Sequence, residues 1–363
     1  MGNPSAAVQP PDLAYLPPLP RGAPPEIGLI GCGGITEVHL RAYRQAGWPV
    51  TALCDLDAKA AEARRKGFYP RARVTTDHHE ILANPAIGVV DIATHPEARG
   101  PLIEDALRAG KHVLSQKPFV TDLEEGERLA DLADELGLLL AVNQNARWAP
   151  HFAYLREAAR GGLIGCPIGV HAAVHWDHSW VENSPFNEIE ALILYDFGIH
   201  WFDFIATVMQ GQEPRRVYAS SRRTPYQTAK PPLLAQAVVE YDHAQATLVF
   251  DGNTPAATWD ATVITGEQGI VRSEGVDIKH QSVRVSTARG VAKPRLKGKW
   301  FPDGFRGAMG ELLQAIEQGR QPSHNARDNL ASLELCFAAV ESANTGRAVV
   351  PGSIRRLPKQ SNA

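Results

Sequence analysis

The strongest constraint on the fold is a regular alternation of short apolar segments with amphipathic segments between residues 26 and 145. The apolar segments have the length and β-branched content of buried strands, and most of the intervening segments read as helices. The predicted strands span residues 27–30, 50–54, 74–75, 89–94, 112–115 and 138–142. Strands that alternate with helices form a parallel sheet with right-handed crossovers, so we expect a doubly wound α/β domain.

A different pattern begins after Pro150, where strand candidates follow one another with short turns of Gly, Asp, Asn and Pro. These candidates span residues 168–176, 217–221, 235–241, 246–250, 258–265 and 283–286. Successive strands with short turns indicate an antiparallel sheet, and helices at 192–209, 305–318 and 328–343 complete an α+β domain. The chain is therefore expected to contain an arm (1–25), an α/β domain (26–145), an α+β domain (146–350) and a tail (351–363).

The first 25 residues form a separate segment because they hold eight of the chain's 27 prolines. Proline fixes the backbone near polyproline II and removes the hydrogen-bond donor that a strand needs. Two interpretations remain open for this arm. It is either a disordered tail or an ordered arm that lies on a partner subunit.

The charge balance excludes several classes of partner. The 363 residues carry 37 Lys and Arg against 40 Asp and Glu, which leaves no basic excess for a nucleic acid or an anionic membrane. No apolar run approaches the roughly 20 residues that span a bilayer, and no basic-then-apolar signal peptide is present. The four cysteines are widely spaced, and we expect reduced, buried thiols in a cytoplasmic protein.

A glycine-rich turn follows the first predicted strand and opens the first helix, with the sequence Gly31-Cys32-Gly33-Gly34-Ile35. In this context the motif predicts a dinucleotide site, because Gly31 permits the tight turn and Gly33 lets a pyrophosphate approach the helix N-terminus. Asp55 ends the second strand, where it can accept both ribose hydroxyls of NAD and repel the 2′-phosphate of NADP. Because Arg64 and Arg65 lie on the next helix rather than beside Asp55, we expect NAD.

Five segments together resemble the glucose–fructose oxidoreductase/inositol dehydrogenase (Gfo/Idh/MocA) family over residues 26 to about 350. They are residues 31–35, 93–94, 109–118, 145–150 and 196–203. The resemblance implies an N-terminal Rossmann domain that binds NAD through Gly31, Gly33, Gly34, Ile35, Asp55, Thr94, His95, Gln116, Lys117 and Asn145. It also implies a C-terminal domain with a large open antiparallel sheet.

The catalytic residues follow from the same resemblance. The family has Glu-Lys-Pro at the end of the fifth strand and a lysine that takes part in catalysis, whereas this chain has Gln116-Lys117-Pro118. The amide can still donate and accept hydrogen bonds, but it cannot neutralise a cation. The resemblance further implies catalytic roles for Asp196 and His200, which share one face if the segment is helical.

The substrate site is expected to include Lys117, Arg147, Trp176, Asp196 and His200. An indole such as that of Trp176 can stack on the CH face of a sugar, although a core position in the sheet is an equal alternative. The role of Asp203, one helical turn after His200, stays open between orienting that imidazole and bonding to the backbone. No metal site is expected from His171, His175 and His178, because they lack Glu or Cys companions and do not share one strand face.

These features lead to one function and two alternatives. We expect an NAD-dependent oxidoreductase that acts on a secondary alcohol of a sugar, cyclitol or glycoside. The first alternative is a glycoside lyase or glycosidase that oxidises its substrate transiently and keeps its NAD, and the second is a non-catalytic NAD- or sugar-sensing regulator. One uncovered face of the antiparallel sheet predicts a homodimer or homotetramer.

Overall fold

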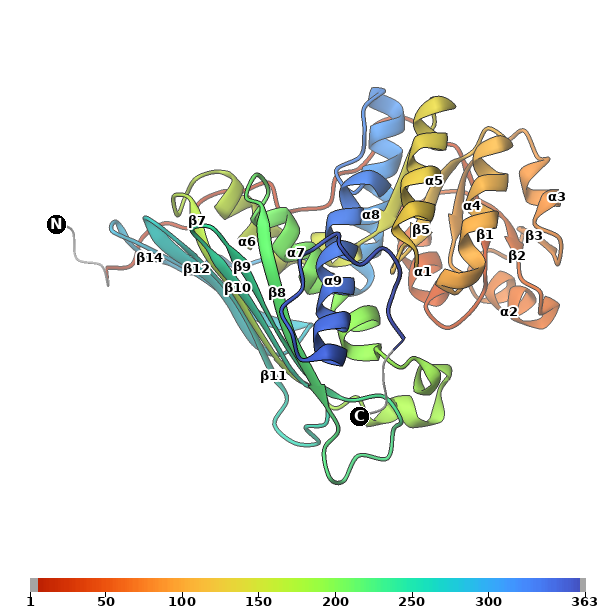
Figure 1. Cartoon of the computed structure of the whole chain (residues 1–363). Helices are drawn as coiled ribbons and strands as arrows, with labels where there is room; N and C mark the ends of the chain where they lie inside the picture. The colour runs from red at the N-terminus through yellow and green to blue at the C-terminus, as the bar shows by residue number, and fades with distance from the viewer. Residues whose placement is uncertain (1–5, 360–363) are drawn as a thin grey trace. The chain divides into compact units, whose positions relative to one another are not determined.

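The computed structural model describes residues 6–359, so the first five residues of the arm and the last four of the tail lie outside the described residues. Contacts divide the chain into two units, drawn in Figure 1. The parallel-sheet unit comprises Leu16–Ala149 and Lys299–Leu330. The large-sheet unit comprises Met1–Tyr15, Pro150–Gly298 and Ala331–Ala363. Each unit therefore contains segments that are far apart in the sequence.

The parallel-sheet unit contains the predicted doubly wound sheet. Its strands are β1 (Glu26–Ile30), β2 (Val50–Cys54), β3 (Arg73–Thr75), β4 (Ile87–Ile92), β5 (His112–Gln116) and β6 (Leu140–Asn143). They lie in the order β3-β2-β1-β4-β5-β6, and every pair is parallel. The strand order reverses between β1 and β4, and in such sheets ligands bind at the carboxyl ends of the strands beside this point.

Helices and short helical turns between residues 36 and 148 connect and follow these strands. They are α1 (Thr36–Ala46), α2 (Ala58–Phe68), α3 (His79–Leu82), α4 (Arg99–Arg108) and α5 (Leu123–Glu135), with short helical turns η1 (Pro96–Ala98) and η2 (Asn145–Trp148). Asp57 caps α2 by accepting the Lys59 N–H at 2.9 Å. Asp122 caps α5 in the same way, since its carboxylate accepts the Glu124 N–H at 2.9 Å.

Helix α8 (Trp300–Gln318) differs from the sequence-based assignment, which placed it in the second domain. Figure 1 shows this blue helix among the orange and yellow elements of the parallel-sheet unit. Its apolar stripe, which includes Phe305, Met309 and Leu312, is buried in one core with Leu40 of α1 and Ile27 of β1. The apolar stripe of α8 therefore packs in the parallel-sheet unit. The position of the helix late in the chain gave no indication of this packing.

The large-sheet unit contains an eight-stranded sheet. Its strands are β7 (Pro167–His175), β8 (Pro214–Arg222), β9 (Leu234–Tyr241), β10 (Gln245–Asp251), β11 (Trp259–Gly266), β12 (Gly269–Asp277), β13 (His280–Thr287) and β14 (Gly290–Ala292). They lie in the order β14-β13-β12-β11-β7-β10-β9-β8. Two corrections apply. The sequence analysis missed β12 and β14, and β7 pairs with β10 in parallel while the other pairs are antiparallel.

One face of this sheet is buried and the other is exposed. Side chains alternate strictly along β9, where every second residue from Ala235 to Tyr241 is buried. The helical elements of this unit are α6 (Pro150–Arg160), η3 (Ser179–Asn183), η4 (Pro185–Glu188), η5 (Ile193–Phe197) and α7 (Ile199–Val208). Helix α9 (Ala326–Thr345) begins in the parallel-sheet unit and continues into this one. The exposed face carries large apolar side chains, including Tyr218, Val238 and Trp259.

The described part of the arm lies along its own chain. Ala7 pairs with Val291 at the edge of the large sheet, and the Tyr154 hydroxyl donates to the Pro11 carbonyl at 2.9 Å. Farther along, in the parallel-sheet unit, the backbone N–H groups of Arg21 and Gly22 donate to the Glu317 carboxylate. In residues 6–25 the arm thus has side-chain and backbone partners in its own chain, and its place on a partner subunit stays a prediction.

Two further expectations concern the thiols and the membrane. Cys32, Cys54 and Cys336 are buried as expected, but Cys166 is exposed because it lies in the bend that precedes β7. All four cysteines are free. Among residues 6–359, no helix has both the length and the apolar character needed to cross a membrane.

Candidate active site

The glycine-rich turn joins β1 to α1 at the switch point of the parallel sheet. Gly31 has φ +93°, and a Cβ there would lie 2.8 Å from the Ala93 carbonyl oxygen, so only glycine fits. A Cβ at Gly33 or Gly34 would meet no protein atom within 4 Å. The turn therefore leaves open space at the N-terminus of α1, where backbone N–H groups without helical acceptors favour a phosphate. This geometry fits the pyrophosphate of a dinucleotide.

Asp55 lies at the carboxyl end of β2 and holds the turn. Its two carboxylate oxygens accept the Cys32 N–H at 2.6 Å and the Asp57 N–H at 2.8 Å. Each oxygen keeps a further lone pair for a ribose hydroxyl. Burial, together with the charge of Asp55, raises the pKa of Cys32 to about 12, so this thiol stays protonated and inert.

Arg64 requires a correction to the cofactor argument, which placed both arginines of α2 away from the site. The Arg64 guanidinium reaches the turn and donates to the Gly33 carbonyl at 2.8 Å. Arg65 instead forms an ion pair with Glu62, in which Nη2 lies 2.6 Å from Oε1. A cation therefore does lie at the glycine-rich turn, because the side chain of Arg64 is long enough to span from α2 to it.

Lys117 directly follows β5 in a tightly held segment. The buried Arg99 guanidinium donates to the carbonyl oxygens of Gln116, Pro118 and Thr94. The Gln116 side-chain oxygen accepts the Lys117 N–H at 2.8 Å. These contacts fix the backbone of Lys117 at the carboxyl edge of the sheet, which is the edge that carries the glycine-rich turn.

The other predicted cofactor residues of this unit occupy different environments. The Thr94 side-chain oxygen is buried and has no hydrogen-bond partner among the described residues, and His95 precedes η1. The Asn145 amide is already used, because its oxygen accepts the Trp300 indole N–H at 2.7 Å and its nitrogen donates to the Asn143 carbonyl at 3.2 Å. Asn145 therefore has its backbone, its second amide N–H and the lone pair that Trp300 leaves to offer a cofactor.

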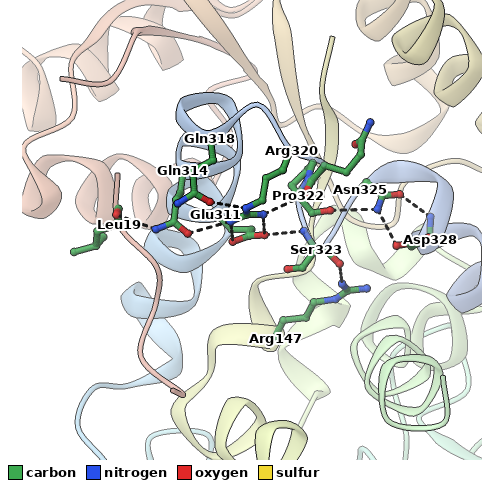
Figure 2. Close-up of polar contacts among 11 residues, drawn as sticks. Leu19, Arg147, Glu311, Gln314, Gln318, Arg320, Pro322, Ser323, Asn325 and Asp328 are labelled. Carbon is green, nitrogen blue, oxygen red and sulfur yellow. Dashed lines mark hydrogen bonds and ion pairs between the residues drawn. The ribbon is translucent and has the colours of Figure 1, made fainter. Parts of the chain in front are cut away.

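Arg147, predicted to bind substrate, belongs to a polar network inside the parallel-sheet unit (Figure 2). Its guanidinium donates to the Ser323 carbonyl, and the Ser323 N–H donates to Glu311 at 2.7 Å. Arg320 holds both oxygens of Glu311, at 2.8 and 3.1 Å. Burial alone would raise the pKa of Glu311, but hydrogen bonds from Arg320 and Ser323 outweigh it and keep this pKa below its ordinary value. At least one guanidinium nitrogen of Arg147 is therefore used in a structural hydrogen bond to the Ser323 carbonyl.

The two predicted catalytic residues of the large-sheet unit lie on a helical segment of mixed type. Asp196 belongs to the π-helical turn η5, whereas His200 lies in the first turn of α7. Gly198 lies between them, where a Cβ would come within 2.7 Å of the Ile193 carbonyl. Single π-turns inside helices often mark functional sites. Asp203, whose role was open, accepts the Ser332 hydroxyl at 3.0 Å.

An aromatic group surrounds the start of this helix. Trp176 follows β7, contacts Trp201 of α7 with ring centroids 5.9 Å apart, and stacks on His178 at 5.8 Å. Burial lowers the pKa of His178 to about 4, so its imidazole is neutral at physiological pH. Its Nδ1 and the Trp176 indole nitrogen are buried without a hydrogen bond among residues 6–359. Trp176 is thus placed beside the helix that carries His200.

The three histidines that suggested a metal cluster have separate surroundings. His171 bonds to the Thr247 hydroxyl at 2.8 Å, His175 pairs with Asp251 at 2.8 Å, and His178 packs among aromatic rings. Elsewhere, ligand atoms of Asp77, His78 and His79 lie within 4.8 Å of one another. Asp77 already accepts the His79 N–H at 2.9 Å to start α3, so this exposed group has a structural explanation.

Several residues of the parallel-sheet site were missed by the sequence analysis. Arg99 has no local signal, because its role depends on carbonyl groups that only the fold collects. Asp91 did give a signal, since it is a charged residue inside an otherwise apolar buried strand. His39 and Tyr43 lie at i and i+4 on the buried face of α1, where a polar pair is unusual.

Comparisons with known proteins agree with this geometry. The model of the oxidoreductase family with an NAD-binding Rossmann fold (GFO_IDH_MocA) matches residues 26–144, and the GFO/IDH/MocA C-terminal domain model matches residues 152–272. D-apiose dehydrogenase of Paraburkholderia graminis is 28% identical over 88% of this chain and 88% of its own length. Inositol 2-dehydrogenase of Rhizobium meliloti is 28% identical over 87% of this chain and 96% of its own length.

A solved structure shows the same fold over nearly the whole chain. An oxidoreductase from Agrobacterium radiobacter in complex with NAD+, L-tartaric acid and magnesium has a TM-score of 0.79 at 22% identity, and the alignment covers 91% of this chain and 99% of that one. The parallel-sheet unit contains the NAD-binding Rossmann fold of the matched model, and the second model covers β7 to β11 and part of β12. The chain therefore belongs to the GFO/IDH/MocA family of NAD-dependent oxidoreductases.

Proposed function

We propose that this enzyme oxidises a secondary alcohol of a sugar, cyclitol or glycoside with NAD as the acceptor. The observation that carries the proposal is the placement of Lys117 at the carboxyl end of β5, fixed by Arg99 and Gln116 in the NAD-binding unit. Two relatives over most of the chain are named for D-apiose and inositol, which are both polyhydroxylated. The substrate class follows from this likeness.

The proposed reaction assigns one task to each side chain. When bound, NAD accepts the hydride that leaves the substrate carbon. His200 takes the hydroxyl proton, so the alcohol becomes a ketone and the electron pair of the O–H bond becomes part of the C=O bond. The Lys117 ammonium donates to the same oxygen and stabilises its developing negative charge. Asp196 orients these groups.

The cofactor is proposed to bind at the glycine-rich turn. The open space over Gly33 and Gly34 and the N-terminus of α1 would receive the pyrophosphate, and Asp55 would accept the ribose hydroxyls. Ile35, Thr94, His95, Gln116 and Asn145 complete the proposed cofactor site. Charge repulsion by Asp55 favours NAD over NADP, although Arg64 at the turn opposes part of this preference.

The substrate wall is proposed to include Trp176, with Arg147 as a polar contributor through the part of its guanidinium that Ser323 leaves. The indole of Trp176 offers an apolar face for sugar CH groups.

The three buried thiols fit the cytoplasmic location that we keep as a prediction.

The function is tested with purified full-length enzyme and a panel of sugars, cyclitols and glycosides. Nicotinamide reduction is followed at its absorbance band, and products are identified by mass spectrometry. We expect Lys117→Ala and His200→Ala to lower kcat by at least a hundredfold while NAD still binds. Lys59→Ala and His243→Ala replace exposed residues of the same types and should keep normal turnover.

Three outcomes would contradict the proposal. Near-normal turnover of His200→Ala across pH would remove it as the base. A cleaved product without net NADH would indicate the lyase or glycosidase alternative. Saturable binding of a sugar without any turnover would indicate the sensing regulator.

We also propose that the chain forms a homodimer or a dimer of dimers through the exposed face of the large sheet. Tyr218 and Val238 are 48% and 37% exposed and lie opposite each other on the neighbouring strands β8 and β9, and Trp259 of β11 is 40% exposed on the same face. Light scattering should give an oligomer at micromolar concentration, and Val238→Glu should dissociate it. A monomeric wild-type protein would refute the assembly.

A further inference from the structure

A buried polar network connects the first helix of the parallel-sheet unit with the segment that carries Lys117. Its centre is His39 of α1, which is fully buried. His39 Nδ1 lies 2.7 Å from Asp91 Oδ2, and the Tyr43 hydroxyl donates to the same oxygen at 2.7 Å. Burial and the charge of Asp91 raise the pKa of Tyr43, so this hydroxyl remains a donor.

The opposite nitrogen of His39 faces two amides. His39 Nε2 lies 2.9 Å from the Gln116 side-chain nitrogen and 3.3 Å from the Asn143 side-chain nitrogen. The Gln116 amide cannot be turned around, because its oxygen accepts the Lys117 N–H at 2.8 Å. Its nitrogen must therefore point at His39, and an amide nitrogen only donates. His39 Nε2 must accept, so the ring is neutral and carries its proton on Nδ1.

We propose that His39 is a positioning residue for Lys117. Its neutral ring, fixed by Asp91, sets the orientation of the Gln116 amide, which in turn holds the backbone N–H of Lys117. This inference rests on the proposed function for the claim that Lys117 is catalytic. It assigns a function to Asp91 and His39, which would otherwise be an expensive polar pair in an apolar core.

The network also explains how an amide can replace the family's glutamate before the lysine. A carboxylate at position 116 would accept the Lys117 N–H and would need a donor on its other oxygen, so His39 would have to take up a proton. The carboxylate at position 116, Asp91 and protonated His39 then carry two negative charges and one positive charge, a sum of −1. With Gln116 and neutral His39 the sum is also −1, from Asp91 alone. The replacement therefore changes the proton on His39 without changing the net charge near Lys117.

The same histidine connects the lysine to the cofactor turn. His39 lies one turn into α1, whose first residue, Thr36, donates its hydroxyl to the Gly33 carbonyl at 2.6 Å. The ring is packed by Tyr43 of its own helix, Asp91 of β4, Gln116 of β5, Asn143 of β6 and Phe305 of α8. A shift of α1 would thus be transmitted to the Lys117 backbone through two side chains, those of His39 and Gln116.

The first test is spectroscopic and does not depend on activity. Histidine ring nitrogens are labelled with ¹⁵N in the full-length enzyme, and His39→Leu identifies the His39 signals by their loss. At pH 7.5 we expect His39 in the neutral form with the proton on Nδ1. In Gln116→Glu we expect both ring nitrogens protonated. A charged His39 or a proton on Nε2 in the wild type, or no change in Gln116→Glu, would overturn the proposal.

The second test measures the consequence for Lys117. His39→Leu should lower kcat by ten- to a hundredfold with little change in the NAD dissociation constant, since a small misplacement of a catalytic group is costly. His39→Gln restores an acceptor toward Gln116 and should recover most of the loss. Tyr43→Phe removes one of two donors to Asp91 and serves as the matched control with near-normal kcat.

The outcomes separate the two proposals. If Lys117→Ala abolishes turnover while His39→Leu does not, the positioning role is refuted and the proposed function stands. If Lys117→Ala keeps normal turnover, the proposed function fails and the positioning role fails with it. Melting temperatures and NAD binding of each variant establish that it is folded. If His39→Leu does not fold, the ring-nitrogen signals of Gln116→Glu decide the protonation claim.

Discussion

Gly33→Ala should separate cofactor binding from stability, because nothing in the protein opposes the added methyl group. A Cβ at Gly33 meets no protein atom within 4 Å, and Gly33 does not have the positive φ that penalises side chains. We therefore expect the free energy of unfolding to stay within about 0.5 kcal/mol of wild type. NAD should bind at least tenfold more weakly, about 1.4 kcal/mol, because the methyl group fills the space proposed for the pyrophosphate.

Two other glycines, one before and one after α1, provide matched controls. Gly31→Ala brings a Cβ to 2.8 Å from the Ala93 carbonyl at φ +93°. Ala93 cannot move away easily, since its N–H donates to the Ile30 carbonyl at 2.7 Å. We expect a loss of about 3 kcal/mol or more from backbone strain and overlap together. Gly47 has φ +75° but open space around its Cα. Gly47→Ala should therefore lower the free energy of unfolding by about 1–2 kcal/mol through backbone strain alone, with NAD affinity unchanged.

The measurements are urea unfolding for stability and titration calorimetry for NAD. The reasoning is refuted if Gly33→Ala binds NAD as tightly as wild type. It is equally refuted if Gly33→Ala loses as much stability as Gly31→Ala, because the turn would then be packed rather than open.

Three further predictions follow from the contacts. NAD should bind at least tenfold more tightly than NADP and Asp55→Ala should narrow this gap, which competitive binding of the two cofactors checks; equal wild-type affinities would contradict the role of Asp55. The pKa of Glu311 is lowered in the fold, so its stabilisation should be present above its ordinary pKa of 4.5 and lost as the pH falls below it; Glu311→Gln should cost about 1–3 kcal/mol at pH 7 and flatten the acid limb of the stability profile. Removing residues 1–25 should lower the melting temperature by several degrees without abolishing NAD binding, because the Pro11 and Glu317 contacts are lost, and an unchanged melting temperature would assign the arm no structural role.

Much of the parallel-sheet unit could be predicted because its signals are local. Apolar strands, caps such as Asp57 and closing glycines such as Gly47 each act within a few residues of their position. Strand β12 was missed because Gly269, Gly275 and three polar residues interrupt its alternation. Its identity as a strand comes from pairing with β11 and β13, which no local pattern encodes.

The site could be predicted only where a motif names the residue. The glycine-rich turn, Asp55 and Lys117 belong to short patterns with a known chemical reason. Arg99 and His39 act through carbonyl and amide groups that come together from strands β4, β5 and β6, so their roles depend on tertiary structure. The parallel pairing of β7 with β10 also depends on tertiary structure. Sequence order favours pairing between consecutive strands, whereas β8 and β9 separate β7 from β10 along the chain.

The position of α8 has a consequence for synthesis of the chain. The core around Ile27 and Leu40 includes Phe305 and Met309, so it is incomplete until the ribosome has passed residue 318. At about 5–20 residues per second, roughly 10–30 s elapse between the emergence of residue 149 and that of residue 318. During that interval the nascent NAD-binding unit exposes an apolar surface that chaperones can recognise. A chain released after residue 298 should therefore be protease-sensitive between residues 26 and 149, and adding residues 299–330 should restore protection.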